Sequence, residues 1–224
     1  MLLVQEACRD GLGDQVFELG EALGLSESAT FYPPGHEEGI AVLSALPLER
    51  SRAELLPHTA GPQRALLCLW ISRPFELEVI CTHLSFRPEH DRRGQLEAVL
   101  AAARASRRPV VIGGDFNLSP QELPESAGGF SDALAGIDVS WPMVSLEEFA
   151  SAWRRRVGSD LPADFDAAPR RLDHLLCRGL CTSGRGRVIV PGFDHALVWA
   201  DFAPLPGAGE AGQHQGQKPI PAVR

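Results

Sequence analysis

The sequence has almost no lysine, no long hydrophobic run and no paired-cysteine motif. Lys218 is the only lysine among 21 basic residues, and the 29 acidic residues leave a formal net charge of −8. This excess of negative charge argues against a protein that coats nucleic acid or an anionic membrane non-specifically. No stretch approaches the roughly 18 uninterrupted apolar residues of a membrane-spanning helix, and no basic-then-apolar segment opens the sequence. We therefore expect a cytoplasmic protein without a membrane span.

The cysteine content argues against both a disulfide-stabilised fold and a cysteine-bound zinc site. There are five of them, an odd number, and none forms a CxxC pair. Cys68 and Cys81 lie inside apolar runs, where a thiol behaves as a small hydrophobic side chain. Neither a disulfide framework nor a structural zinc site is favoured.

Apolar residues are abundant enough for one substantial core. The 224 residues are 44% hydrophobic and 22% charged, which excludes disorder throughout and favours one large domain. After Phe202 the sequence turns to Pro, Gly, Gln and Ala, a composition that buries too little apolar surface to fold. We predict one domain over residues 1–203 and a disordered tail over residues 204–224.

Apolar periodicity predicts a mixed α/β domain. Leu96, Val99, Leu100 and Ala103 recur at helical spacing, so their segment is predicted to be an amphipathic helix that covers a sheet. Continuous apolar runs predict buried strands. The predicted strands cover residues 1–7, 39–43, 65–72, 77–84, 110–112, 172–177 and 196–202, and the predicted helices cover residues 14–23, 90–106 and 146–156.

Polar side chains stand at the ends of five apolar runs. The ends of strands in one sheet lie on a common edge, so these side chains are expected to meet in one pocket. A single Asp or His at a strand end is usually a cap or a turn residue, whereas five such clusters together indicate a site. The clusters are Gln5-Glu6, Thr82-His83-Leu84, Gly114-Asp115-Phe116-Asn117, Arg171-Leu172-Asp173-His174 and Phe193-Asp194-His195.

Several carboxylates in one pocket require a positive partner. A hard divalent cation held by Glu6, Asp194 or Asp115 would relieve their repulsion, and oxygen ligands suit Mg²⁺ or Mn²⁺ better than Zn²⁺. Imidazoles beside carboxylates also indicate acid–base chemistry or contact with an anionic substrate, because an Asp fixes the tautomer of a His and raises its pKa.

The motifs and their order resemble the endonuclease/exonuclease/phosphatase superfamily, the deoxyribonuclease I-like proteins. The resemblance covers residues 2–202, and the segment from Gly113 to Asn117 is its strongest single motif. The full set, in chain order, is Leu3-Val4-Gln5-Glu6, the segment from Gly39 to Ser44, Cys81-Thr82-His83-Leu84-Ser85, Arg93 with Gln95, the segment from Gly113 to Asn117, Arg171-Leu172-Asp173-His174 and Asp194-His195-Ala196.

The resemblance implies a four-layer α/β (α+β) sandwich of two mostly antiparallel sheets flanked by helices, with the site at one end. It also implies that metal-activated water hydrolyses a phosphoester. His174 receives no role, and we interpret it as a packed strand histidine. The implied roles are metal binding for Glu6 and Asp194, orientation or deprotonation of water for Asp115, contact with a phosphate oxygen or that water for Asn117, contact with the scissile phosphate for His195, orientation of His195 for Asp173, a second phosphate-facing imidazole for His83 and, more weakly, substrate binding for Arg64.

The chain departs from the superfamily at its first strand. Members begin with a central strand that bears a metal-binding Asn, whereas this sequence starts at the strand of Gln5 and Glu6. A missing central strand removes a ladder of hydrogen bonds and part of a core, a loss larger than the ~5–15 kcal/mol by which domains are stable. We therefore predict a misplaced gene start, an in-frame upstream strand, and an unpaired sheet edge in the chain as given.

Two functions remain open at this point. The first is a divalent-metal-dependent hydrolase of phosphoester bonds, a nuclease or a phosphodiesterase acting on a small substrate. The alternative is a non-catalytic phosphate-binding or interaction module on the same scaffold. The expected partners are a phosphoester substrate, with nucleic acid as one candidate, and Mg²⁺, with Mn²⁺ as a substitute. Trp141, Trp153 and the arginines at 154–156 are candidate contacts to nucleic acid, and a monomer is expected.

Overall fold

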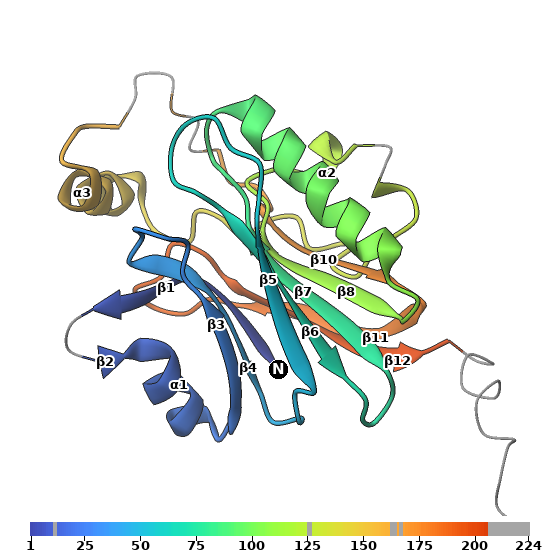
Figure 1. Ribbon diagram of the computed structural model, residues 1–224. Coiled ribbons are helices and arrows are strands. Elements are labelled where there is room, and N and C mark those ends of the chain that lie inside the picture. Colours follow the sequence, from blue (N-terminus) through green and yellow to red (C-terminus); the bar gives the residue numbers. More distant parts are fainter. Residues whose placement is uncertain (11–12, 125–126, 162–164, 166–167, 206–224) are drawn as a thin grey trace, which may run out of the picture.

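Two β-sheets pack face to face and carry helices on their outer faces, as the computed structural model shows (Figure 1). The structure describes residues 1–10, 13–124, 127–161, 165 and 168–205, so residues 206–224 of the tail predicted over 204–224 lie outside the described residues, while Pro204 is the last residue of a strand. The strands are β1 (Leu2–Asp10), β2 (Gly13–Asp14), β3 (Glu27–Phe31), β4 (Glu38–Ser44), β5 (Arg50–Leu55), β6 (Ala65–Ile71), β7 (Leu77–His83), β8 (Val110–Asp115), β9 (Ser131–Asp132), β10 (Asp173–Arg178), β11 (Leu180–Val188) and β12 (Leu197–Pro204). The helices are α1 (Gln15–Leu23), α2 (Glu89–Ala105) and α3 (Leu146–Val157), and Pro120–Glu122 forms a short 3₁₀ turn.

The larger sheet has the strand order β5-β6-β7-β8-β10-β9, and the smaller has the order β2-β1-β4-β3. All neighbours are antiparallel except β7 and β8, which run parallel and are joined through α2. β11 and β12 pair with each other as a separate hairpin. This arrangement confirms the predicted sandwich.

The side chains of β6 alternate between two cores. Leu67 and Leu69 face β4 of the smaller sheet and form the core between the sheets. Leu66 and Cys68 face the other way, in the core beneath α2. Because both faces of the sheet are covered, every residue of β6 is buried, which explains its uninterrupted apolar run.

The two outer layers are α2 and α1. The apolar stripe of α2 packs on the larger sheet, as its helical spacing predicts. On the opposite side, Val16 of α1 packs with Ala41 and Leu43 of β4. The resulting order of helix, sheet, sheet and helix is the predicted four-layer architecture (Figure 1).

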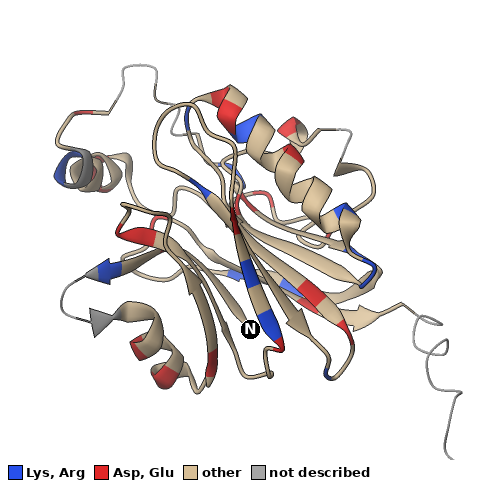
Figure 2. Ribbon diagram, viewed as in Figure 1, with Lys and Arg blue, Asp and Glu red and all other residues tan. Residues whose placement is uncertain are grey.

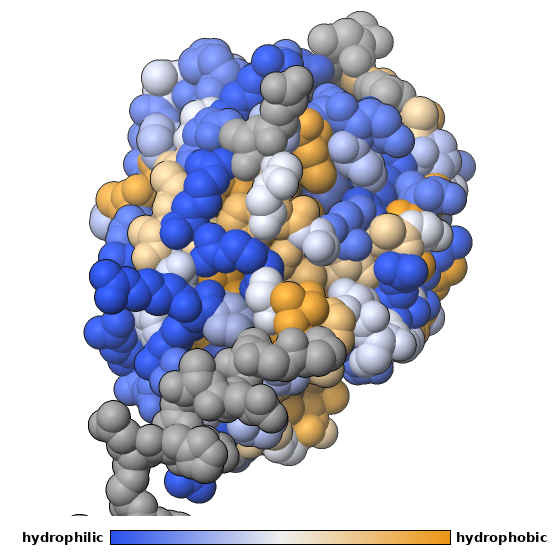
Figure 3. Space-filling model, turned by 90° about the vertical axis from the view of Figure 1, so that its right-hand side faces the viewer, coloured by the Kyte–Doolittle hydropathy of each residue, from blue (hydrophilic) through white to orange (hydrophobic). Residues whose placement is uncertain are grey.

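The face of the protein in Figure 3 carries both hydrophilic residues and apolar patches. Among the described residues, no helix is both long and apolar enough to cross a membrane.

β1 has an open edge in the described part of the chain. β4 pairs with one side of β1 along most of its length. On the other side only Arg9 and Asp10 pair, with the short strand β2. This is the unpaired edge expected from the sequence, and a strand that fills it stays a prediction.

Sequence periodicity did not identify β3, β5 or β11. β5 has the sequence Arg-Ser-Arg-Ala-Glu-Leu and lies at the edge of the larger sheet. Most of its residues are exposed, and its charged residues (Figure 2) interrupt the alternation of apolar and polar residues that would identify a strand. β11 contains Gly184 and Gly186, which usually interrupt strands. Here a Cβ at Gly186 would lie within 3 Å of the Trp199 ring, so the glycines make room for this indole.

A tight approach of β7 to β8 explains the glycine before Asp115. Gly114 has φ 145°, and a Cβ at this position would lie 1.8 Å from the carbonyl oxygen of Thr82. We expect Gly114→Ala to lower the free energy of unfolding by about 3–5 kcal/mol, from strain and overpacking together. Urea unfolding measures this loss.

Gly94→Ala is the matched control. Gly94 lies in α2 with open space around the Cβ position, so this substitution should stabilise the protein by about 0.5–1 kcal/mol. Equal effects of the two substitutions would contradict the packing described for Gly114.

Candidate active site

Three of the predicted residues lie side by side on neighbouring strands. His83 is the last residue of β7 and is in register with Asp115, the last residue of β8. Asp115 is in register with Asp173, the first residue of β10. The ends of three strands thus present an imidazole and two carboxylates in one row, as expected from the polar clusters at strand ends.

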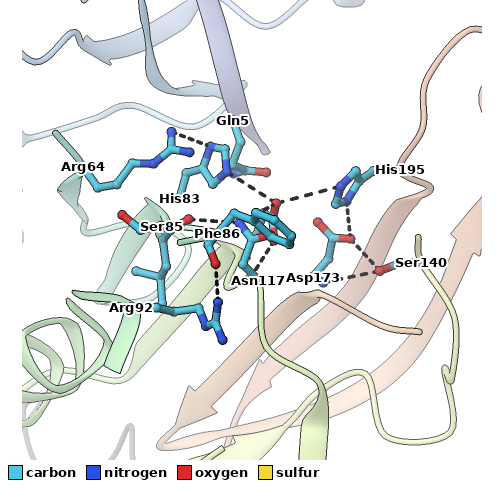
Figure 4. Close-up of polar contacts among 12 residues, drawn as sticks. Gln5, Arg64, His83, Ser85, Phe86, Arg92, Asn117, Ser140, Asp173 and His195 are labelled. Carbon is cyan, nitrogen blue, oxygen red and sulfur yellow. Dashed lines mark hydrogen bonds and ion pairs between the residues drawn. The ribbon is translucent and has the colours of Figure 1, made fainter. Parts of the chain in front are cut away.

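His195 completes this row from the loop before β12. Its Nδ1 lies 2.9 Å from Oδ2 of Asp173, and its Nε2 lies 3.9 Å from Oδ2 of Asp115. On the other side of Asp115, Nε2 of His83 lies 3.4 Å from the same Oδ2. Asp115 therefore lies between the imidazoles of His83 and His195, and Figure 4 shows these two rings facing each other across the site.

Arg64 determines the tautomer of His83. Its Nη1 lies 3.2 Å from Nδ1 of His83, and a guanidinium is only a donor. Nδ1 of His83 must therefore accept, so in the neutral ring Nε2 carries the proton and points it at Asp115. Arg64 thus lies beside His83 and acts on it directly, while its predicted contact with substrate stays a prediction.

The buried charges of the site shift two pKa values. Burial raises the pKa of Asp115 to about 7, because the attraction of His195 offsets the cost of desolvation only in part. Burial alone would lower the pKa of His195, but its hydrogen bond to Asp173 and the charges of Asp173, Asp115 and Asp194 outweigh that effect and raise the pKa to about 10. Both shifts act in the same direction, because each favours the protonated form of its group: the imidazolium of His195 and the neutral carboxyl of Asp115.

Asn117 holds the Asp115 carboxylate in place. Its backbone has φ 52°, and its N–H donates to Oδ1 of Asp115 at 2.8 Å. Its side-chain amide donates to the carbonyl oxygen of Leu84 at 3.0 Å and to Oδ2 of Asp115 at 3.3 Å. Both amide hydrogens thus bind protein oxygens, and contact of Asn117 with a phosphate or a water stays a prediction.

The two predicted metal ligands, Glu6 and Asp194, form no preassembled cage with other described residues. Glu6 is exposed at a β-bulge of β1, with φ 54°. Asp194 is half-buried next to His195. The described residues contain no group of three or more His, Cys, Asp or Glu arranged to hold a metal. These donors fit Mg²⁺ or Mn²⁺, since Mg²⁺ is usually held by one or two carboxylates, waters and substrate phosphates.

Arg171 and His174 lie outside the site although their motif contributes Asp173. Arg171 is buried and donates to Asp132 at 2.6 Å and to the carbonyl oxygen of Leu134 at 2.7 Å. His174 is buried against Phe116, with ring centroids 4.9 Å apart. Both side chains support packing, which agrees with the interpretation of His174 as a structural residue.

The pH dependence of stability should report the burial of His174. Its Nε2 lies 2.7 Å from the carbonyl oxygen of Leu118, and its buried Nδ1 has no hydrogen-bond partner among the residues that the structure describes. Burial lowers the pKa of His174 to about 4 from 6.5. The unfolded chain therefore binds a proton before the folded one does, so folding loses stability as the pH falls from about 6.5 to 4, by on the order of 3 kcal/mol.

Chemical unfolding across this pH range measures the effect. His174→Phe should flatten the dependence relative to the wild-type protein, whereas replacement of the exposed His58 by Gln should leave it unchanged. An unchanged slope in His174→Phe would contradict the assignment.

Sequence reasoning missed Ser140 and three members of an aromatic cluster near the site, Phe86, Phe149 and Phe165, whereas Trp141 and Trp153 were named as candidate contacts to nucleic acid. Ser140 donates to Oδ2 of Asp173 at 2.6 Å, and no periodicity or motif marks it. The aromatic cluster contains Phe86, Trp141, Phe149, Trp153 and Phe165, with neighbouring ring centroids 5.3–6.5 Å apart. The Trp141 ring lies 6.4 Å from that of His195, so this cluster adjoins the polar row.

Residues 1–206 match the model of the Endonuclease/Exonuclease/phosphatase family. The chain belongs to this family. The family description covers endonucleases, exonucleases and phosphatases, all of which act on phosphoester bonds. No curated protein sequence matches the chain.

Solved structures of family members share the fold. A protein from Beutenbergia cavernae DSM 12333 is 20% identical with a TM-score of 0.66, over 90% of this chain and 62% of that one. TDP2 from D. rerio, complexed with a single-strand DNA product, is 16% identical with a TM-score of 0.67, and the match covers 90% of this chain and 84% of the TDP2 chain. The human Nocturnin catalytic domain with a bound sulfate is 20% identical with a TM-score of 0.59, and the match covers 91% of this chain and 80% of the Nocturnin chain. This chain thus spans less than two thirds of the Beutenbergia protein.

Proposed function

We propose that this family member is a divalent-metal-dependent phosphodiester hydrolase that uses water as the nucleophile, with nucleic acid as the favoured substrate. The observation that carries the proposal is the placement of Asp115 between His83 and His195 at the ends of neighbouring strands. A carboxylate in this position accepts a proton from water, while the two flanking imidazoles present N–H groups toward a phosphate.

Each side chain of the row has a distinct task in this mechanism. Asp115 orients the attacking water and takes its proton. His195, held by Asp173, donates to a phosphoryl oxygen on which negative charge develops. His83, with its tautomer fixed by Arg64, donates to a second phosphoryl oxygen when substrate replaces its contact with Asp115.

Glu6 and Asp194 are the proposed holders of Mg²⁺, for which Mn²⁺ can substitute. When bound, the ion supplies Lewis-acid stabilisation of the charge on the phosphoryl group. Glu6 is suited to this task because it is exposed at a bulge that turns its backbone out of the regular strand.

The aromatic cluster supports a nucleotide substrate. Phe86, Phe149, Trp153 and Phe165 are only partly buried, so their rings offer an apolar surface beside the phosphate-facing groups. Aromatic side chains of this kind stack on bases with little sequence preference. In contrast, Arg154 pairs with Asp160 at 2.7 Å, which weakens its predicted role as a contact to nucleic acid.

Hydrolysis assays with and without a chelator test the proposal. Bis-p-nitrophenyl phosphate and a single-stranded oligonucleotide should be hydrolysed by the protein with Mg²⁺ or Mn²⁺. EDTA should abolish the activity, and added Mg²⁺ should restore it. Binding of the oligonucleotide without hydrolysis would favour the non-catalytic alternative, and hydrolysis that survives chelation would exclude the metal dependence.

A further inference from the structure

Ser140 lies in the interior of the site, behind the Asp173–His195 pair. It is fully buried and belongs to a segment joined to Arg170 by an isolated β-bridge at Trp141. Figure 4 shows Ser140 on the side of Asp173 away from His83. No carboxylate or imidazole other than Asp173 is bonded to its hydroxyl among the described residues.

The hydrogen bonds of the Ser140 hydroxyl determine the direction of its proton. Oγ accepts from the backbone N–H groups of Leu172 at 3.2 Å and Asp173 at 3.3 Å. These groups only donate, so the hydroxyl proton points at Oδ2 of Asp173, 2.6 Å away. That oxygen also accepts from Nδ1 of His195 at 2.9 Å. One carboxylate oxygen thus has two donors, which fix its rotamer.

The backbone of Ser140 holds the other partner of the pair. Its carbonyl oxygen accepts from the N–H of Ala196 at 2.8 Å, directly after His195 in the chain. Its own N–H donates to the carbonyl oxygen of Arg170 at 3.1 Å. Ser140 therefore connects the start of β10, which carries Asp173, to the loop that carries His195.

We propose that Ser140 is a positioning residue that holds Asp173 and, through it, the ring of His195 in the orientation needed for phosphodiester hydrolysis. This inference rests on the proposed function. Without the hydroxyl, the Asp173 carboxylate keeps only the hydrogen bond from Nδ1 of His195. It can then rotate about χ2, a torsion with a broad range of accessible angles. His195 then loses its fixed direction toward the substrate. A misplacement of about 1 Å in a site of this kind costs about 10²-fold in rate.

The kinetic test compares Ser140→Ala, Ser140→Cys and Ser140→Thr in the 224-residue chain. The Ala and Cys variants should lower kcat for bis-p-nitrophenyl phosphate by ~10–100-fold, with KM within about twofold, because misplacement affects the transition state more than ground-state binding. Ser140→Thr keeps the hydroxyl and should restore kcat to within about threefold. Cys keeps the volume but is a weak donor, so it separates loss of the hydrogen bond from loss of packing.

Ser44→Ala is the matched structural control. Ser44 is also fully buried, and its Oγ accepts from the backbone N–H of Leu46 at 2.9 Å. Its loss should destabilise the fold, as the loss of a buried hydrogen bond does, by about 1–3 kcal/mol, and should leave kcat unchanged. A decrease in kcat in Ser44→Ala equal to that in Ser140→Ala would show that general destabilisation explains the effect.

A spectroscopic measurement tests the positioning without activity. The Nδ1 proton of His195, bonded to a carboxylate, should give a far-downfield NMR resonance that is absent in His195→Gln. We expect the resonance in the wild-type protein and in Ser140→Thr, and its loss or displacement in Ser140→Ala. If these spectra follow the prediction but no variant hydrolyses a phosphodiester, the proposed function is wrong and the positioning is right. A wild-type resonance and a wild-type kcat in Ser140→Ala would overturn the positioning role.

Discussion

Asp115→Asn is expected to lower kcat for phosphodiester hydrolysis by ~10²–10⁴-fold, the usual effect of removing a general base. The substitution conserves shape, so the hydrogen bond from the N–H of Asn117 to Oδ1 can persist. The amide cannot accept a proton from water between His83 and His195. Steady-state kinetics should therefore show a loss in kcat without a comparable increase in KM.

Asp160→Asn is the control for this change. Asp160 is an exposed carboxylate that pairs with Arg154, so its replacement should leave both kinetic constants unchanged. A kcat in Asp115→Asn within tenfold of the wild-type value would remove Asp115 from the proposed role. Urea unfolding of both variants verifies that the fold is retained.

His195→Gln should lower kcat by ~10²–10³-fold, because the phosphoryl oxygen loses a charged donor. Asp173→Asn should have a similar effect, since an amide at this position no longer offers the anion that orients His195. The two residues act as one unit. The double variant should therefore lose little more activity than either single variant.

A double-mutant cycle on kcat measures this coupling. Fully additive losses in the double variant would mean that His195 and Asp173 act independently, which contradicts their 2.9 Å contact as the functional arrangement. Loss of activity in His195→Gln alone, with Asp173→Asn fully active, would restrict the role of Asp173 to stability.

The sequence predicted the row of site residues because His83 and Asp115 stand at the ends of apolar segments that form neighbouring strands and finish at the same edge of the sheet. The apolar runs that end at His83 and Asp115 belong to β7 and β8, whose last residues pair. Side chains of paired residues on neighbouring strands lie next to each other. The polar residues at the ends of the apolar runs were therefore sufficient to predict which side chains meet in the site. The consecutive residues Leu66 and Leu67 point to opposite faces of the sheet, and each face packs in its own core.

Other features depend on contacts that no local pattern encodes. Ser140 lies in a stretch without periodicity, and its importance comes from partners at Leu172, Asp173 and Ala196, more than thirty residues away. β11 was missed because its glycines usually interrupt a strand. They fit here because the Trp199 ring from the neighbouring strand occupies the space where a Cβ of Gly186 would lie. The orientation of the Asn117 amide toward Asp115 also required the three-dimensional turn after β8.

The stereochemical course at phosphorus tests the central claim most directly. In the proposed mechanism, water attacks the phosphodiester in line and in a single step, with Asp115 as its base. A phosphorothioate diester of known configuration, hydrolysed in isotopically labelled water, should give a product with inverted configuration and the label on phosphorus. Retention of configuration would indicate two displacements through a covalent intermediate and would contradict the account.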